Sequence, residues 1–418
     1  MSRTAPAVDL GLAGTLFDAL AQATRQGRGI VRDSYGSGEQ AGYDIIRSAA
    51  ERLGLEVATD PIGNMTMTLP GWDRSTPRIL IGSHLDSVPQ GGNFDGAAGV
   101  IAGLCAVAAL RASGVTPGCD VAVMAIRGEE SAWYDVSYIG SAGAFGLLEP
   151  TALAVPRFDT GQSLGEALAE QGLNPEPIRM RRRLLDPASI RAYLELHIEQ
   201  GPILVRKGSP AAVVTGIRGC QRFRNARCVG AYAHSGAVER GDRHDAVAAT
   251  VALLHHLEQI WLEEERLGAD LVFSCGEFYT NPAMHGPSKV AGETSFVIDL
   301  RSLSTETMAR MAEEARGAAA RIGERYRVTF DLGAISTSAP GLMDPALRAA
   351  LLRQLDEPFE MASGAGHDAA VFAGMGIPTA MIFVRNENGS HNPDEAMELA
   401  DFAVATEALV GLLINFPS

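Results

Sequence analysis

The sequence predicts an α/β protein whose larger domain contains a mixed sheet and is interrupted by a smaller, ferredoxin-like α+β domain. Apolar segments at 78–82 and 120–126 flank a helix-like stretch at 96–111, which is the pattern of a β-α-β unit. After about residue 210 the order becomes β-α-β-β-α-β, and after about residue 340 the α/β pattern resumes. The expected segments are 1–209 for the first part of the larger domain, 210–338 for the inserted domain, and 339–418 for the second part.

Each expected element follows from periodicity and turn residues. Residues 16–26 and 43–53 show helical spacing, and the strands expected at 55–59 and 65–69 are separated by the turn at 60–64. Inside the inserted domain the expected strands are 223–232, 271–279, 294–301 and 328–332, and the expected helices are 245–267 and 305–326. An apolar segment at 381–384 is expected to be a core strand.

Composition excludes several classes of partner. The chain has 418 residues, 46% of them hydrophobic, and a formal charge of −15. Nucleic acids and anionic membranes are therefore not expected as partners, because both require a basic surface. The first eleven residues have no long apolar run, and the five cysteines form no Cys-x-x-Cys pair. We expect reduced thiols and a cytoplasmic protein.

The stretch from Gly82 to Gly96 is the most informative part of the chain. His84 and Asp95 lie eleven residues apart among residues that favour tight turns, and Glu129 and Glu130 follow the next apolar strand. Ligands gather beyond the carboxyl ends of parallel strands, so these side chains should share one edge of the sheet. Histidine and carboxylate ligands, with one carboxylate left as a base, are typical of a hydrolytic metal site.

Two more of the nine histidines lie in contexts that suit a ligand. His197 interrupts an apolar strand that is closed by Gly-Pro, and His391 lies in a loop directly after the strand at 381–384. Asp86, two residues after His84, is placed to hold the ring of that histidine as a hydrogen-bond acceptor.

Together these residues suffice for two metal ions that share one carboxylate. The five expected ligands are His84, Asp95, Glu130, His197 and His391. Glu129 then suits the general base. Tandem glutamates are commonly solvated and a lone histidine is commonly structural, but the apolar strand before Glu129 and the nearby Trp133 favour a buried site.

Six motifs in this chain resemble those of the hydantoinase/carbamoylase group of amidases. They are GSHLDSVP at 82–89, GGNFDG at 91–96, EES at 129–131, ELHIEQGP at 195–202, SGAGHDA at 363–369 and SHNPDE at 390–395. The group comprises dinuclear metal amidohydrolases, including N-carbamoyl-L-amino acid amidohydrolases, β-ureidopropionases and allantoate amidohydrolases. The resemblance implies a catalytic larger domain and an inserted lid and dimerisation domain.

The resemblance also implies roles for individual residues. His84, Asp95 and His197 match the ligands of one metal, whereas Asp95, Glu130 and His391 match those of the other. Glu129 matches the catalytic base. Two divalent ions per subunit are implied, with zinc expected first and manganese, cobalt or nickel as alternatives.

Further matched residues concern the substrate, for which the resemblance implies an N-carbamoyl or N-acyl amino acid. His234 matches a lid histidine that polarises the scissile carbonyl across a dimer interface, which implies a homodimer. Gln200 matches a ureido-binding amide. Arg301 matches an arginine that binds the substrate carboxylate as a bidentate pair, although a salt bridge at a strand end is the alternative. His367, in a glycine-rich turn, has a substrate-orienting or a structural role.

This chain departs from the group at positions that bear on the substrate. Ser288 stands where relatives usually carry a substrate-binding asparagine, and the segment 235–240 after the lid histidine is atypical. The tandem glutamates are followed by Ser131 instead of glycine, and then by aromatic residues. Allantoate-type ureido compounds, other N-acyl amino acids and dipeptides therefore remain alternative substrates. A non-catalytic metal-binding protein is disfavoured, because no expected ligand or base is missing.

Overall fold

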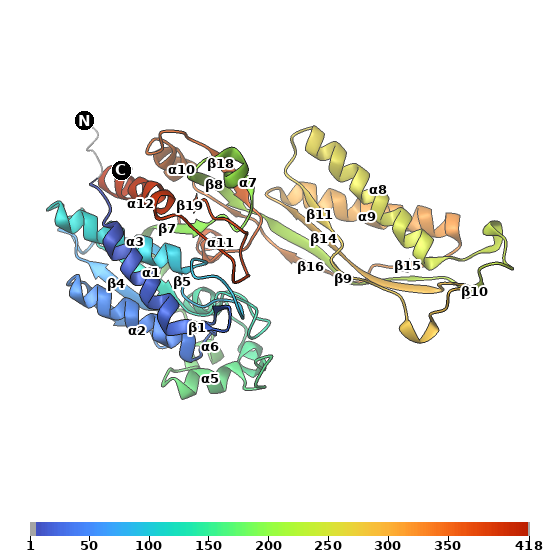
Figure 1. Cartoon of the computed structure of the whole chain (residues 1–418), viewed down its shortest axis with the longest axis horizontal. Helices are drawn as coiled ribbons and strands as arrows, with labels where there is room; N and C mark the ends of the chain where they lie inside the picture. The colour runs from blue at the N-terminus through green and yellow to red at the C-terminus, as the bar shows by residue number, and fades with distance from the viewer. Residues whose placement is uncertain (1–5, 417–418) are drawn as a thin grey trace. The chain divides into compact units, whose positions relative to one another are not determined.

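The computed structural model describes residues 6–416 and divides the chain into two compact units (Figure 1). Unit 2 is Ile217–Gly341, and unit 1 consists of the described residues on either side of it. Unit 1 begins with α1 (Leu10–Thr24), a short ribbon of β1 (Arg25–Gln26) and β2 (Gly29–Ile30), and α2 (Ser37–Arg52).

A mixed sheet forms the centre of unit 1. Among the described residues it has nine strands, in the order β17-β8-β19-β7-β5-β6-β4-β3, with β18 paired to β8. The strands are β3 (Glu56–Thr59), β4 (Met65–Leu69), β5 (Arg78–His84), β6 (Val121–Ile126), β7 (Ile190–Ile198), β8 (Ala211–Ile217), β17 (Gly341–Leu342), β18 (Glu360–Ser363) and β19 (Thr379–Val384). The central four, β19-β7-β5-β6, are parallel, whereas β3, β4 and β8 pair antiparallel. The predicted mixed α/β fold is therefore confirmed.

The predicted β-α-β unit is present, because β5 and β6 are parallel neighbours joined through α3 (Ala97–Ala112). Nearly all of α3 is buried. A Cβ atom on Gly99 would lie 2.3 Å from the carbonyl oxygen of Leu196, and one on Gly103 would lie 2.7 Å from Val123. These glycines therefore let the helix approach the sheet closely, as the Gly- and Ala-rich sequence indicates.

The two faces of β7 contact different surroundings. Ala192, Leu194 and Leu196 belong to the main apolar core, to which α1, α3 and α12 (Leu399–Ile414) also contribute. The alternate residues Tyr193, Glu195 and His197 point to the other face, because side chains alternate along a strand. There Tyr193 stacks on Phe372 of α11 (Asp368–Gly374) with ring centroids 3.7 Å apart. The polar face of β7 carries the side chains that matter for the site.

The remaining helices of unit 1 are short. They are α4 (Ile139–Ala144), α5 (Leu164–Glu170), α6 (Glu176–Arg179), α7 (Ile203–Lys207) and α10 (Pro345–Leu352). No helix in the described range is long and apolar enough to cross a membrane. All five cysteines are free.

Unit 2 contains an antiparallel sheet and two long helices (Figure 1). Its path is β11-β14-β9-β15, with β12 paired to β14 and β16 to β9. The elements are β9 (Gly219–Val229), α8 (Ala246–Arg266), β11 (Val272–Ser274), β12 (Phe278–Tyr279), β14 (Glu293–Ser302), α9 (Thr305–Tyr326), β15 (Thr329–Asp331) and β16 (Ile335–Ser338). A separate ribbon pairs β10 (Ala233–His234) with β13 (Lys289–Val290).

Several sequence-based boundaries were wrong, among them the start of α2 at Ser37 instead of residue 43, and two have a local cause. The strand predicted at 271–279 is two strands, β11 and β12, because the segment between them interrupts the pairing with β14. At the same place, between Phe296 and Ile298, the register of β14 against β9 also shifts. Helix α1 begins at Leu10, six residues before the prediction, because the Asp9 side chain caps it by accepting from the Leu12 amide at 3.1 Å.

Candidate metal centre

Two neighbouring parallel strands and the loop after one of them bring the first group of candidate ligands together. His84 is the last residue of β5 and does not lie beyond the strand, as the sequence suggested, whereas His197 is the penultimate residue of β7 and lies within a strand as expected. Asp95 lies in the loop before α3. Its Oδ1 is 3.6 Å from His84 Nε2 and 3.2 Å from His197 Nε2. The three side chains form one buried cluster that could hold a metal ion.

A second cluster shares Asp95 with the first. His391 Nε2 lies 3.4 Å from Asp95 Oδ2 and 3.2 Å from Glu130 Oε1. The two oxygens of Asp95 thus face different sets of partners, with His84 and His197 on one side and His391 and Glu130 on the other.

Orphaned polar atoms in this cluster match a site for divalent cations. Asp95 Oδ1 and His197 Nε2 are buried, and neither has a hydrogen-bond partner in the described part of the chain. Leaving such atoms unsatisfied in the interior is costly, whereas a cation would accept lone pairs from both. The donors are imidazole nitrogens and carboxylate oxygens without a thiolate, which suits zinc, manganese, cobalt or nickel.

Glu129 lies beside the first cluster, with Oε2 3.8 Å from His84 Nε2. Burial raises the pKa of Glu129 well above its ordinary value against the opposing effect of His84, and the neighbouring Glu130 raises it further. A carboxylate with a raised pKa is suited to accept a proton near neutral pH.

Asp86 connects the loops that carry these side chains. The fully buried carboxylate lies 3.2 Å from His84 Nδ1 and accepts the backbone N–H groups of Glu129 and Glu130, each at 3.1 Å. Ser34 Oγ also donates to it at 2.6 Å. One side chain therefore fixes the imidazole of one candidate ligand and the backbone on which the tandem glutamates stand.

Three groups around Asp95 extend the site, and two of them were missed in the sequence. Gln200 Nε2 donates to Asp95 Oδ2 at 2.8 Å, and Ser390 Oγ donates to the same oxygen. Glu395 Oε1 accepts the backbone N–H groups of Phe94 at 2.8 Å and Asp95 at 3.2 Å. Ser390 and Glu395 lie in the SHNPDE motif together with His391, and their place in that motif could have identified them from the sequence.

His367 is buried beside His197, with ring centroids 4.4 Å apart, and its Nε2 is 2.9 Å from Ser363 Oγ. Burial holds the pKa of His367 well below its ordinary value, and the adjacent His197 lowers it further. Glu195, which the sequence analysis did not single out, completes a third buried group with these two histidines. A charged residue in an apolar strand was the signal for it.

The aromatic residues after the tandem glutamates are buried. Trp133 Nε1 donates to the carbonyl oxygen of Ser87 at 2.7 Å, and its ring lies 5.4 Å from that of Phe158. Arg157 stacks on the same ring at 4.5 Å. The aromatic side chain of Trp133, which the sequence predicted near the site, therefore supports the loop that follows Asp86.

Unit 2 carries the other three residues that the sequence analysis named. His234 in β10 pairs with Lys289 in β13, and the amide of Ser235 donates to the carbonyl oxygen of Ser288 at 2.8 Å. The structure therefore brings His234 and Ser288 together on one exposed ribbon.

Arg301 lies near the end of β14, where it donates to Asp299 Oδ2 from Nε at 3.3 Å and from Nη2 at 3.0 Å. Arg222 donates to the same oxygen at 2.8 Å. The salt bridge considered as the alternative for Arg301 is therefore present in the structure.

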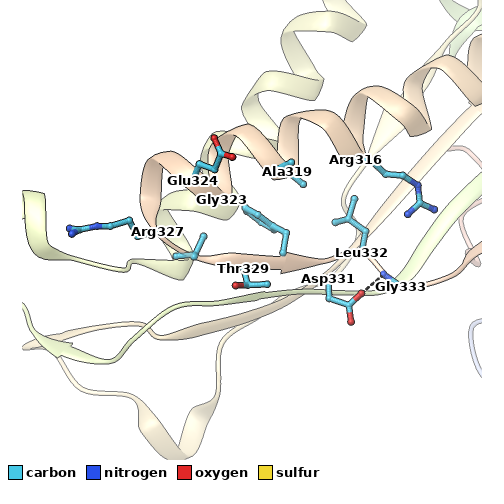
Figure 2. Close-up of a pocket in the computed structure, with 12 residues that line it drawn as sticks. Arg316, Ala319, Gly323, Glu324, Arg327, Thr329, Asp331, Leu332 and Gly333 are labelled. Atoms are coloured by element: carbon cyan, nitrogen blue, oxygen red, sulfur yellow. Dashed lines mark hydrogen bonds between the residues drawn. The ribbon is translucent and has the colours of Figure 1, made fainter.

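A hollow of about 780 Å³ lies between α9 and β15 of unit 2 (Figure 2). Arg316 and Glu324 of the helix and Asp331 of the strand are among its lining residues. None of the candidate site residues lines it.

Comparisons with known proteins identify a family and several relatives. Residues 80–415 match Peptidase family M20/M25/M40. The N-carbamoyl-L-amino acid amidohydrolase of Geobacillus stearothermophilus is 34% identical over 388 residues, which cover 91% of this chain and 92% of that protein. The allantoate amidohydrolase of Escherichia coli (strain K12) is 31% identical over 368 residues, 86% of each chain. The crystal structure of an amidase of the hydantoinase/carbamoylase family from Burkholderia multivorans superimposes with a TM-score of 0.87 at 26% identity, covering 98% of each chain.

The mixed sheet, the candidate metal-ligand clusters and the match over most of the chain define a hydrolase, and the chain belongs to Peptidase family M20/M25/M40. Within that family it is an amidohydrolase of the hydantoinase/carbamoylase group.

Proposed function

We propose that this amidohydrolase cleaves the C–N bond of an N-carbamoyl-L-amino acid or a closely related ureido acid. The observation that carries the proposal is the pair of histidine–carboxylate clusters that share Asp95, with the buried Glu129 beside them. Relatives named for N-carbamoyl-L-amino acids and for allantoate support the substrate class.

Two divalent cations, zinc in the first place, are proposed to occupy the clusters. His84, Asp95 and His197 would hold one, and Asp95, Glu130 and His391 the other. When bound, such a pair supplies an activated water and polarises the substrate carbonyl. Glu129 is proposed to take the proton of the attacking water on its carboxylate and to deliver it to the departing nitrogen. For an N-carbamoyl substrate the products are the amino acid, ammonia and carbon dioxide.

Asp86 and Gln200 are proposed to assist in different ways. Asp86 keeps His84 Nδ1 engaged, so that Nε2 is left to face the cation. The Gln200 amide now donates to Asp95 Oδ2, the oxygen assigned to the second cation. A cation on that oxygen would leave the amide group to hydrogen-bond the ureido group of a substrate.

Unit 2 is proposed to be a ferredoxin-like lid and dimerisation domain. Its β11-β14-β9-β15 order, with α8 and α9 in the connections, supports that description. We assign Arg301 to the substrate carboxylate and His234 to the scissile carbonyl across the interface of a homodimer. Arg301 donates from two nitrogens to one carboxylate oxygen, Oδ2 of Asp299, and this contact supports the assignment of its side chain to a carboxylate partner.

An allantoate-type ureido substrate is the second candidate. Ser288 supports an altered substrate pocket, because serine reaches less far than the asparagine usual in carbamoylases and allantoate enzymes alike and has one fewer polar group, and the allantoate amidohydrolase relative supports this particular candidate. Other N-acyl amino acids and dipeptides are further alternatives, and the substrate panel described next tests them too. His367, beside His197, is proposed to support that ligand and to line the substrate side of the site.

A substrate panel tests the proposal. The cation-loaded protein should hydrolyse N-carbamoyl or ureido acids faster than N-acetyl amino acids and dipeptides, whereas activity confined to dipeptides would refute the assignment. Glu129→Gln should lower kcat by a factor of about 10²–10⁴ while the cations stay bound. Retained turnover in that variant, with cation content verified by elemental analysis, would remove Glu129 from the role of base.

A further inference from the structure

The segment 32–39, which runs from the end of β2 into α2, contacts the loops that carry the proposed ligands. Its first residue, Arg32, is fully buried. Arg32 Nε donates to the carbonyl oxygen of Leu85 at 2.5 Å, directly after His84. Nη1 donates to Asn93 Oδ1 at 3.1 Å, and Nη2 lies 3.3 Å from the carbonyl oxygen of Asn93 and 3.5 Å from that of Asp95. One guanidinium therefore bridges the backbone beside two proposed ligands.

The backbone of the same segment is tied to the first of these loops. The amide of Arg32 donates to Ser87 Oγ at 3.0 Å, and the amide of Ser87 donates to the carbonyl oxygen of Arg32 at 2.8 Å. Ser34 Oγ donates to Asp86 Oδ2 at 2.6 Å, and Asp86 in turn faces His84 Nδ1. Ser34 thus acts on the proposed ligand through one intermediate side chain.

A third contact reaches the loop of the tandem glutamates. Glu39 Oε1 accepts the amide of Gly128 at 3.0 Å, and Oε2 accepts the amide of Tyr35 at 2.6 Å. Glu39 also pairs with Arg127 at 2.9 Å. The segment is therefore bonded to both ends of the loop that joins β5 to α3 and to the loop that follows β6.

We propose that Arg32 is a positioning residue that sets the spacing between His84 and Asp95 for cation binding, with Ser34 acting on the same loop through Asp86. The inference rests on the proposed ligand set. A planar guanidinium has several donors in fixed directions, so it can hold acceptors at both ends of the loop between β5 and α3 at once, whereas a lysine ammonium at the same place cannot reproduce that fork. Loss of such outer partners weakens metal binding by a factor of about 10–100.

A competing explanation is that Arg32 only balances the buried carboxylates around it. Charge balance predicts that Arg32→Lys, which keeps the positive charge, binds cations like the wild type. Positioning predicts that Arg32→Lys already weakens binding. The two explanations therefore differ in the outcome of one conservative substitution.

The test is titration of the cation-free protein with Co²⁺ alone, followed by calorimetry and by the visible d–d spectrum, whose shape reports ligand geometry. For Arg32→Lys we expect the dissociation constant to rise about 10–100-fold and the spectrum to change. Val410→Ala, a buried cavity variant in α12, is the control for destabilisation and should keep the wild-type affinity and spectrum.

Wild-type affinity and spectrum in Arg32→Lys would overturn the proposal, as would an equal loss of affinity in Val410→Ala at an equal loss of Tm. Should Arg32→Lys not fold, Ser34→Ala decides: at least about threefold weaker binding supports the proposal, and unchanged binding overturns it. A wild-type protein that binds no Co²⁺ would instead refute the proposed ligand set, so the two failures are distinguishable.

Discussion

Replacing Gly96 by alanine should disable the proposed metal centre through a single added methyl group. Gly96 has φ 65° and ψ −49°, and the amide of Ala97 donates across it to the carbonyl oxygen of Asp95 at 2.7 Å. This is a tight three-residue turn of a kind that is rare and strained for residues with a side chain. A Cβ atom on Gly96 would lie 2.4 Å from Cε1 and Nδ1 of His84.

The magnitude follows from these distances. Ordinary Cβ contacts begin at 3.4 Å, so the imidazole of His84 or the backbone of Asp95 must move by about 1 Å. Displacement of that size costs about 100-fold in rate at a catalytic site. The positive φ costs about 1–2 kcal/mol and the crowding about 1–3 kcal/mol of stability. Gly96→Ala should therefore lose about 100-fold in kcat/KM and about 2–5 kcal/mol in free energy of unfolding.

The assay compares kcat/KM, Co²⁺ affinity and Tm with those of a matched control. Gly114 has a similar φ of 68°, and none of the described atoms beyond its chain neighbours lies within 4 Å of the position of an added Cβ. Gly114→Ala thus carries the backbone strain without the collision, and it should lose about 1–2 kcal/mol but keep wild-type kcat/KM and affinity. The prediction is refuted if Gly96→Ala keeps both kcat/KM and Co²⁺ affinity within about threefold of the wild-type values, or if Gly114→Ala loses as much activity as Gly96→Ala.

Further outcomes follow from other contacts. Asp86→Asn places an NH₂ group against the amide of Glu129 or Glu130, and should lower the free energy of unfolding of the cation-free protein by about 1–3 kcal/mol in urea titrations; an unchanged midpoint would contradict this. Asp95 and Glu130 raise the pKa of His391 to about 10, so its ring is protonated at neutral pH and a cation must displace the proton. Cation affinity should therefore rise with pH, by up to about tenfold per unit, and a flat calorimetric profile between about pH 6.5 and 8.5 would count against His391 as a ligand. Arg301→Lys should raise KM by about tenfold for substrates with a free carboxylate while leaving their amide analogues unaffected, and equal effects on both would exclude the proposed carboxylate contact.

The sequence could predict the parts of the fold that follow from local pattern. The two apolar strands around α3 were found because parallel strands joined by a helix have a characteristic spacing. The same reasoning placed His84, Asp95 and Glu130 at one edge of the sheet, where the structure brings them together. The exact strand ends were not predictable, because hydrogen bonding to β6 extends β5 through His84.

Long-range contacts were not accessible from the sequence. Arg32 lies in a polar segment between two helices, and nothing in its neighbours shows that its side chain is buried against a loop more than 50 residues away. Glu195 was detectable in principle, because it alternates with Leu194 and Leu196 along β7. The interruption between β11 and β12 depends on pairing with β14, which a single apolar run does not reveal.

The place of β19 in the sheet constrains how a ribosome can produce this protein. This strand lies between β7 and β8, although it is synthesised more than 160 residues after them. Until it emerges, the facing edges of β7 and β8 have no partner strand between them, while all of unit 2 has already left the ribosome and can fold. The nascent chain therefore exposes two open strand edges late in synthesis, and this is the stage at which aggregation or chaperone capture is most to be expected.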